Sequence, residues 1–401
     1  MNHNEKNILI VSCFGHFMSH FNMLMFPALV MPLTAKFGMD LTAVLALSFW
    51  MYLLFGLSAL PWGLLTDAVG AKPMMLGFFI GAGLCGLAAV FYMDDPTLFA
   101  VSLAGVGMFS GIYHPAGLGL ISRGVSRMSM GMGYNGMAGN AGLAAAPVLT
   151  GVANYLFGAK AAYVCLGGLN FAGAALILFL RWDEPPPGAV RTESHGRRSL
   201  ISGFVVLLVC MMLGGVAYRG ASVILPSYFE LRNQTLFDFF SRVDWLPASR
   251  NVAATMLASL VFLVGIFGQY LGGRAAERYE PRKMYFLFHA LALPMALAVA
   301  FTTDIPLFFF AMAYMFFMLG MQPIENTLVA YLTPDKLRHS GFGLKFIVTF
   351  GVGSLSVHLV GWIKEAWSLP AVFVALSVVS VGILLSILLL MAVTRKMQLR
   401  N

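Results

Sequence analysis

The sequence feature that most constrains the fold is a short charged segment between two long apolar runs. Residues 63–72 read Gly-Leu-Leu-Thr-Asp-Ala-Val-Gly-Ala-Lys, with one apolar run over 41–62 and another over 73–93. Each run is close to the ~20 residues that an α-helix needs to cross a bilayer core of ~30 Å. We therefore predict two membrane-spanning helices joined by a short polar loop.

The same arrangement returns in the second half of the chain, again between two apolar runs. Shorter matches accompany it: residues 26–29 resemble 225–228, residues 114–115 resemble 322–323, and residues 131–135 resemble 341–345. The corresponding loop residues are Gly63 and Gly273, Asp67 and Glu277, and Lys72 and Arg282. A repeated unit of helix, charged loop and helix is typical of a membrane transporter built from two helical bundles.

Composition supports a membrane protein. Apolar residues make up 59% of the chain and charged residues 10%, whereas soluble domains have about 25% charged residues. We predict an all-α integral membrane fold with twelve transmembrane helices in two pseudo-symmetric six-helix bundles. The predicted spans are 8–33, 42–65, 73–93, 97–121, 129–156, 160–181, 200–228, 250–276, 282–302, 305–332, 341–363 and 368–393. The predicted organisation is an N-terminal bundle over 1–181, a cytoplasmic linker over 182–199 and a C-terminal bundle over 200–401.

Charge placement predicts the orientation in the membrane. The formal net charge is +8, but the basic residues lie in short loops between apolar runs, which argues against a nucleic-acid partner. Most Lys and Arg residues fall on the side of the N-terminus, which favours both termini in the cytoplasm and a multi-pass location in the cell (inner) membrane. The outer segment 229–250 is either a short amphipathic helix on the surface or a solvated loop. The four cysteines lie in apolar runs without metal-site or disulfide spacing.

At the first charged loop the chain resembles the major facilitator superfamily. The loop keeps Gly63, Leu65, Asp67, Gly70 and Lys72 of that family's helix 2–3 motif. Ala68 stands where a basic residue is usual; the second copy has that basic residue as Arg278 but carries Glu280 where glycine is usual. The resemblance implies that this loop latches the cytoplasmic side of the outward-facing state. The implied gating residues are Gly63, Asp67, Lys72, Gly273, Glu277, Arg278 and Arg282.

Two further stretches resemble particular branches of that family. Gly133, Gly142, Ala146, Pro147 and Gly151 resemble its antiporter motif, although small-residue helix packing explains each of them individually. Residues 111–115, 139–142 and 19–20 resemble the fosmidomycin-resistance-like exporters. That branch usually has an acidic residue at the position of Ala116, and the family's helix 4 arginine is absent, with Gly107 near its place. The substrate is therefore not carried over.

Polar side chains within the predicted spans are the candidates for substrate binding and proton coupling, because such groups are costly in a bilayer and usually face a cavity or a partner. His16 and His20 share one helix face, and a histidine titrates near pH 6.5. The alternative is that these groups only bond neighbouring helices; Glu325 and Lys345, for example, could form an ion pair that is either a gate or purely structural. The candidates are His16, His20, Tyr113, His114, Asn135, Arg219, Gln322, Glu325 and Lys345.

These observations predict a secondary active transporter that exports a small organic compound, with an anionic one as a candidate, by proton antiport and alternating access. The expected partners are the substrate, H+ and the bilayer, and we expect a monomer without cofactor or resident metal. One alternative is transport of a metal ion or chelate through Met and His groups, since the chain has 26 Met. Another is an intramembrane enzyme, which the single clear intramembrane acid, Glu325, disfavours. The absence of a nucleotide-binding motif disfavours ATP-driven pumping.

Overall fold

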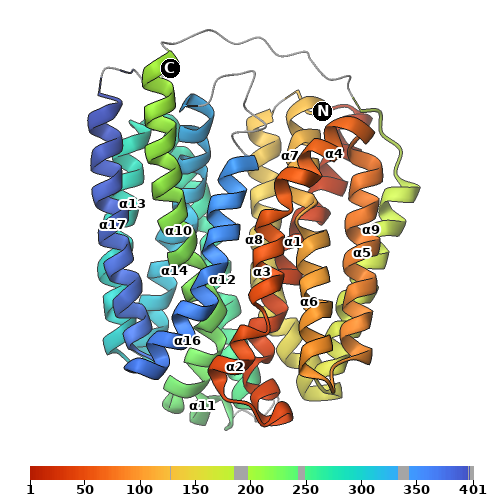
Figure 1. The fold of residues 1–401 in the computed structure, drawn as a ribbon, viewed down its shortest axis with the longest axis vertical. Coiled ribbons are helices and arrows are strands. Elements are labelled where there is room, and N and C mark those ends of the chain that lie inside the picture. Colours follow the sequence, from red (N-terminus) through yellow and green to blue (C-terminus); the bar gives the residue numbers. More distant parts are fainter. Residues whose placement is uncertain (127, 185–196, 243–248, 333–342, 396, 398–401) are drawn as a thin grey trace.

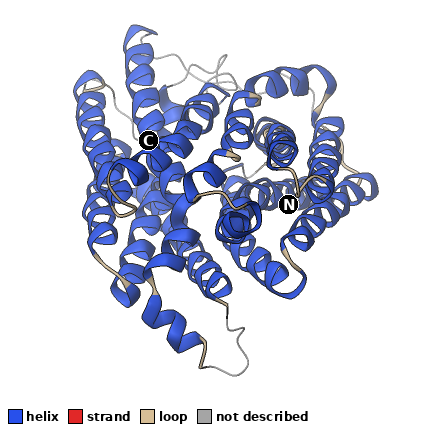
Figure 2. Ribbon diagram, turned by 60° about the horizontal axis from the view of Figure 1, so that its bottom comes forward, coloured by secondary structure: helices blue, strands red, loops and turns tan. Residues whose placement is uncertain are grey.

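The computed structural model describes residues 1–126, 128–184, 197–242, 249–332, 343–395 and 397. Long helices run side by side through the molecule, in one group formed by α1–α9 and another formed by α10–α17 (Figure 1). No strand occurs among the described residues (Figure 2). The all-α membrane fold that the sequence predicts is therefore confirmed.

In the first half, each predicted span corresponds to one helix or to a set of consecutive helices. The helices are α1 (His3–Phe37), α2 (Leu41–Ala46), α3 (Phe49–Leu57), α4 (Ala59–Val69), α5 (Ala71–Phe91), α6 (Pro96–Ser110), α7 (Tyr113–Gly124), α8 (Met128–Phe157) and α9 (Ala159–Phe179).

The second half follows the same plan. Its helices are α10 (Arg197–Arg232), α11 (Gln234–Phe240), α12 (Arg250–Arg278), α13 (Pro281–Phe301), α14 (Asp304–Leu332), α16 (Ser356–Ala366) and α17 (Ala371–Val393). Before α16 the helix passes through a π-helical segment, Ile347–Gly351, and a 3-10 segment, Val352–Leu355.

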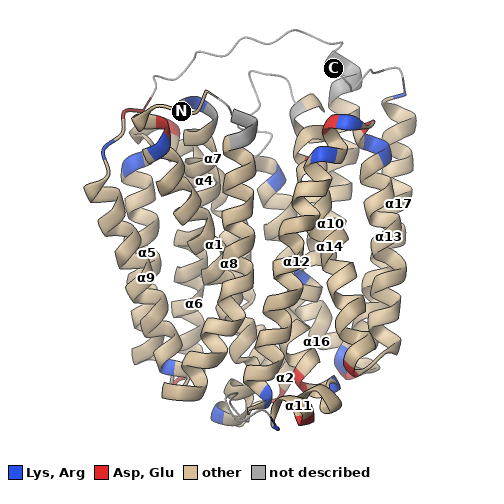
Figure 3. Cartoon of the chain, turned by 180° about the vertical axis from the view of Figure 1, so that it is seen from behind, with Lys and Arg blue, Asp and Glu red and all other residues tan. Residues whose placement is uncertain are grey.

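Among the described residues, ten helices are long and apolar enough to cross a membrane, or eleven if the bent pair 41–57 and 59–69 is one span. Helix α8, with 30 residues, accounts for the remaining predicted span. Large apolar side chains such as Phe91, Phe157 and Phe179 point outward and are 77–85% exposed, as expected for a lipid-facing surface. Charged residues gather at the two ends of the bundle (Figure 3).

The structure corrects the prediction of unbroken helices at 42–65, 97–121 and 341–363. Proline lacks an N–H, and its ring clashes with the carbonyl four residues earlier. Pro61 therefore interrupts the first helix after Leu57, where α3 ends. Pro115 interrupts the second near Gly111, just after α6. The third interruption is the π segment, and π segments often mark functional sites.

The segment after α10, which the sequence predicts to lie outside, contains a short helix rather than only a loop. Helix α11 has partly buried Leu236 and Phe240 against the core, and Arg250 lies 5.0 Å from the centre of the Phe237 ring. Residues 243–248 of this segment lie outside the described residues. Asp304 holds the start of α11 against the start of α14, because its carboxylate accepts a hydrogen bond of 2.6 Å from the backbone N–H of Thr235.

The two groups of helices meet where backbones approach closely. A Cβ atom added at Gly56 of α3 would lie 2.0 Å from the backbone nitrogen of Gly351 in the π segment. Within the first group, a Cβ at Gly142 of α8 would lie 2.2 Å from the carbonyl oxygen of Phe17 in α1. Gly142 of the antiporter-like motif is thus required for packing of α8 against α1.

Candidate functional site

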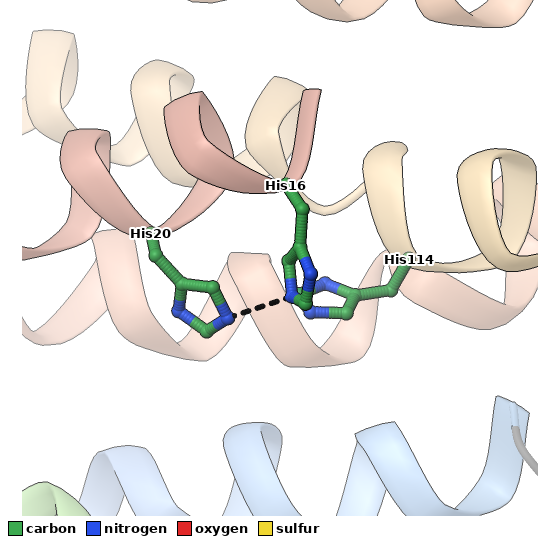
Figure 4. A group of neighbouring side chains, drawn as sticks. All are labelled: His16, His20 and His114. Atoms are coloured by element: carbon green, nitrogen blue, oxygen red, sulfur yellow. Dashed lines mark hydrogen bonds between the residues drawn. The ribbon is translucent and has the colours of Figure 1, made fainter. Parts of the chain in front are cut away.

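Three histidines from two helices form the centre of the candidate site. His16 and His20 lie one turn apart on α1, and His114 lies at the start of α7 (Figure 4). One ring nitrogen from each histidine can be chosen such that all three lie within 4.8 Å of one another. The break after Ser110 brings His114 here, because Pro115 forces a new helix to start at Tyr113.

The hydrogen bonds fix how the ring protons are arranged. Nδ1 of His16 lies 2.8 Å from the backbone carbonyl oxygen of Asn135, which can only accept, so Nδ1 carries the hydrogen. Nε2 of a neutral His16 is then an acceptor, and Nε2 of His20, 3.0 Å away, donates to it. The two hydrogen bonds therefore run in one direction, with His20 donating to His16 and His16 donating to the backbone of α8.

Asn135 and Tyr113 support this chain. The Asn135 amide donates to the Ser12 carbonyl at 3.0 Å and to the Tyr113 hydroxyl at 2.5 Å. The Tyr113 ring stacks on His16, with centroids 5.1 Å apart. Four predicted site residues, His16, His20, Tyr113 and Asn135, therefore share one network that joins α1, α7 and α8.

Aromatic side chains from both groups of helices surround His114. Its ring lies 5.5 Å from Phe55 of α3, 4.6 Å from Phe346 and 5.5 Å from Phe350, measured between centroids. Phe346 directly precedes the π segment of the second half, and Phe350 lies within it. His114 is thus enclosed at the contact between the two halves, where a transport pathway in a two-bundle protein is expected.

Arg219 of α10 brings a charge toward the same region. Its guanidinium carbon lies 3.8 Å from the centre of the Tyr52 ring of α3, and the residue is 3% exposed. Arg219 also interacts electrostatically with His20. The predicted residues Arg219 and His20 therefore lie in the same region of the structure, whereas Tyr52 was not among the predicted residues.

Glu325 and Lys345 form a separate charged group in the second half. Lys345 Nζ lies 2.8 Å from Glu325 Oε1, and the Tyr285 hydroxyl donates to Glu325 Oε2 at 2.8 Å. Lys345 also donates to the side-chain oxygen of Asn326. The ion pair that the sequence suggests is therefore present, and both carboxylate oxygens are engaged.

Gln322 belongs to a third polar contact that joins the two halves. The side-chain amide of Gln269 on α12 donates to Gln322 Oε1 at 3.0 Å and to Asn140 Oδ1 of α8 at 3.1 Å. Sequence analysis missed Gln269, and it also missed His289, which is fully buried beside Tyr285 with a centroid distance of 4.8 Å. Both are polar residues inside apolar runs, the same signal that identified the other candidates.

The predicted gating residues lie at the ends of helices, where each half is tied together. Asp67 Oδ1 lies 3.9 Å from Arg123 Nη2 within the first half. A Cβ on Gly63 would lie 3.3 Å from the Pro115 side chain, and one on Gly273 would lie 3.8 Å from Pro323, so the two motif glycines face equivalent prolines. Glu277 and Arg278 complete the second copy near the end of α12.

The basic ends of the two loops anchor equivalent helix ends. Lys72 Nζ lies 3.5 Å from the carbonyl oxygen of Leu180, after α9, and Arg282 Nη1 donates to the carbonyl oxygen of Thr394, after α17, at 2.6 Å. Carboxylates also accept hydrogen bonds from the backbone at the start of α5 and α13. Glu184 does so in the first half and Glu280 in the second. Glu280, where the family motif usually has glycine, thus caps its own helix.

A bundle of this many apolar helices, with polar groups enclosed where its two halves meet, defines a multi-pass membrane transporter rather than an enzyme. The family model described as Major Facilitator Superfamily matches residues 12–344 and 243–400, and the chain belongs to that family. The resemblance to the superfamily is thereby confirmed.

Comparisons with individual proteins agree with this assignment. The chain is 27% identical over 172 residues to the multidrug efflux pump Tap of Mycolicibacterium fortuitum, a match that spans 42% of this chain and 38% of that relative. A bacterial homologue of the human lysosomal transporter Spinster, in an inward-facing and occupied conformation, has the same fold with a TM-score of 0.73, 14% identity and coverage of 99% and 98%. A mutant of the peptide transporter POT in complex with alafosfalin also has this fold, with a TM-score of 0.73 and 16% identity. The match covers 97% of this chain and 94% of that one. At these identities the structures establish the fold alone.

Proposed function

We propose that the protein is a proton-coupled secondary transporter that exports a small organic compound, with an anionic one as a candidate, by antiport and alternating access. The observation that carries the proposal is the hydrogen-bonded histidine chain at the contact between the halves. Imidazoles exchange protons near neutral pH, and a chain with defined donors and acceptors can pass a proton along it. The efflux relative and the antiporter-like motif of α8 support export rather than import.

The proposed roles follow from the positions of the residues. His16, His20 and His114 exchange the proton, while Tyr113 and Asn135 hold the rings in place. Arg219 and Gln322 contact the substrate. Glu325, paired with Lys345, is the competing proton site, because a carboxylate can also accept the transported proton. We also propose that the protein belongs to the fosmidomycin-resistance-like branch of the superfamily.

We also propose how the cytoplasmic side closes and how the protein is oriented in the membrane. In the outward-facing state, the cytoplasmic side would be held closed by the predicted gating residues, which are Gly63, Asp67, Lys72, Gly273, Glu277, Arg278 and Arg282. Each bundle, 1–181 and 200–401, would move as a unit about the linker 182–199, of which residues 185–196 lie outside the described part. Both termini would be cytoplasmic in the inner membrane, with the protein acting as a monomer.

Transport of a metal ion is the second candidate, and one observation favours it. The nitrogens of His16, His20 and His114 lie close enough together to surround an ion. However, both ring nitrogens of His16 are already engaged in hydrogen bonds, so an ion would have to break the bond between His16 and His20. Proton exchange uses the arrangement as it stands, and for that reason we favour it.

The experiment that tests proton coupling uses full-length protein in vesicles with an imposed pH gradient. Compounds that raise the unfolding temperature in a screen of metabolites and antibiotics serve as substrates, with Zn²⁺ and Co²⁺ in the same screen. His114→Ala and His20→Ala should lose gradient-driven uptake but keep counterflow without a gradient. His358→Ala, at an exposed histidine of α16, is the matched control.

Each other outcome has a defined meaning. If both histidine variants keep gradient-driven uptake and only Glu325→Gln loses it, the histidine assignment is wrong. If all three variants retain it, coupling does not run through these residues. A response to the metal ions alone would favour the second candidate.

A further inference from the structure

Arg219 is a buried cation that forms no ion pair with any Asp or Glu in the described part of the chain. Its Nε has no hydrogen-bond partner among those residues, and its guanidinium rests on the face of Tyr52. The Tyr52 hydroxyl donates to the Met23 carbonyl at 2.9 Å, which holds the ring in position. The cation is therefore placed by an aromatic face rather than by an opposite charge.

The other buried charged side chains differ from Arg219 in having partners. Glu325 and Lys345 pair with each other at 2.8 Å. Arg282 pairs with Glu280 at 2.6 Å, and Glu5 accepts from the backbone N–H of Ser126 at 2.9 Å. Among the described residues of the spans, Arg219 thus leaves one uncompensated positive charge. A buried ion without a partner costs more than a cation–π contact returns, so a structural role does not account for it.

Arg219 lies between the two halves, where a residue that contacts the substrate is expected. It belongs to α10 of the second half, whereas Tyr52 belongs to α3 of the first. One turn earlier, a Cβ at Gly215 would lie 2.1 Å from the carbonyl oxygen of Thr349 in the π segment, and Thr349 Oγ1 is buried without a partner. Unsatisfied donors and an irregular helix therefore gather where the two halves touch.

We infer that Arg219 binds a single oxyanion group of the transported compound, which makes the substrate an organic monoanion. A guanidinium donates two parallel hydrogen bonds to a carboxylate, and one carboxylate neutralises the one unpaired charge. The inference deepens the proposed function, since it rests on a small organic compound passing between the halves. It assigns the charge of the site to Arg219 and leaves the neutral histidines free to exchange protons.

The test compares anionic probes with neutral counterparts of the same shape. Acetate and benzoate are titrated into purified full-length protein at constant ionic strength, with acetamide and benzamide as the neutral probes. At least one anion should raise the unfolding temperature more than its amide does. Arg219→Gln should weaken that binding roughly tenfold to hundredfold, the range for hydrogen bonds to a charged group. Arg274→Gln, at an exposed arginine of α12, is the matched control.

Thermal unfolding without a probe and the comparison of anions with amides are two further measurements that can refute the role of Arg219. Without any probe, Arg219→Gln should unfold at the same or a higher temperature than the wild type, because it removes an unpaired buried ion. A clear decrease would instead show that Arg219 is structural. An equal response of the wild type to anions and amides would also overturn the inference.

The pH dependence separates Arg219 from its neighbours. His20, His16 and His114 lie on the side of the first half, and Tyr52 and Tyr218 flank the guanidinium. Anion binding should persist at pH 8.5, where free histidines are neutral. Loss of binding at pH 8.5 would assign the charge to a histidinium and refute the role of Arg219. Because these measurements use no gradient, they stand apart from the test of proton coupling.

Discussion

Lys345 Nζ lies 2.8 Å from Glu325 Oε1, and the two side chains are 7% and 3% exposed. Tyr285 occupies the other carboxylate oxygen. A buried pair of this kind stabilises the fold little in net terms, yet removing one partner leaves an uncompensated charge. The pair can therefore hold α13, α14 and the helix after Gly343 together. Because each charge is costly to bury alone, single and double substitutions test whether the two residues act as a pair.

We expect Lys345→Met and Glu325→Leu, made singly, to destabilise the protein by about 3–5 kcal/mol, whereas the double variant should recover most of that loss. The measurement is the thermal unfolding midpoint in detergent for the four proteins of the cycle. Equal losses in the single and double variants would mean that the two residues do not act as a pair.

Arg282 should matter more to stability than its counterpart Lys72. Arg282 donates to both oxygens of Thr394 at 2.6 and 2.7 Å and pairs with Glu280, while Lys72 has one long contact at 3.5 Å. Hydrogen bonds to charged groups contribute ~1.5–3 kcal/mol each. Arg282→Met should lower the unfolding temperature clearly and Lys72→Met only slightly; the reverse order would contradict the anchoring role.

Asp67→Asn should leave folding intact and shift the protein toward inward-facing states. Asp67 is 56% exposed and 3.9 Å from Arg123, so the pair contributes at most ~1 kcal/mol. Such an increment can bias a two-state gate without locking it. Spin-label distances between the Val69 end of α4 and the Arg278 end of α12 should lengthen, with Asp183→Asn as an exposed control. Unchanged distances would argue against a gating role.

Asp94 joins three segments at one end of the helices through Lys36 and Lys160, and its effect on stability should depend on pH. Hydrogen bonds from Lys160 and then Lys36 lower the pKa of Asp94 from 3.8 to about 2. Since the folded pKa is depressed, its stabilisation is present above pH 3.8 and is lost as the pH falls toward 2. Asp94→Asn should therefore destabilise equally at pH 7 and pH 5. A difference between those two pH values would contradict the assignment.

Cysteine labelling tests the proposed orientation. In a background without the four native cysteines, an impermeant reagent added outside should modify a cysteine at Gln234, in exposed α11, and spare one at Gly196, which lies outside the described residues. Labelling only at Gly196 would reverse the topology. Labelling of both would indicate permeable cells and is checked with a cytoplasmic marker.

Local patterns in the sequence were enough to predict the helices, because a bilayer requires ~20 apolar residues per span and leaves few alternatives. The twelve predicted segments follow from that constraint, and polar residues stand out against the apolar runs it requires. Even the breaks near Leu57 and Gly111 are local, since Pro61 and Pro115 act on the carbonyl four residues earlier.

Only the tertiary structure decided which polar groups meet. Positions far apart in the chain become neighbours through helix packing, which no local pattern encodes. His16 finds its carbonyl partner at Asn135, Arg219 rests on Tyr52, and Gln269 joins Asn140 to Gln322. The same packing pairs Lys345 with Glu325 and leaves Arg219 without an acid among the described residues. The unpaired charge between α10 and α3 is therefore a property of the fold and not of any one segment.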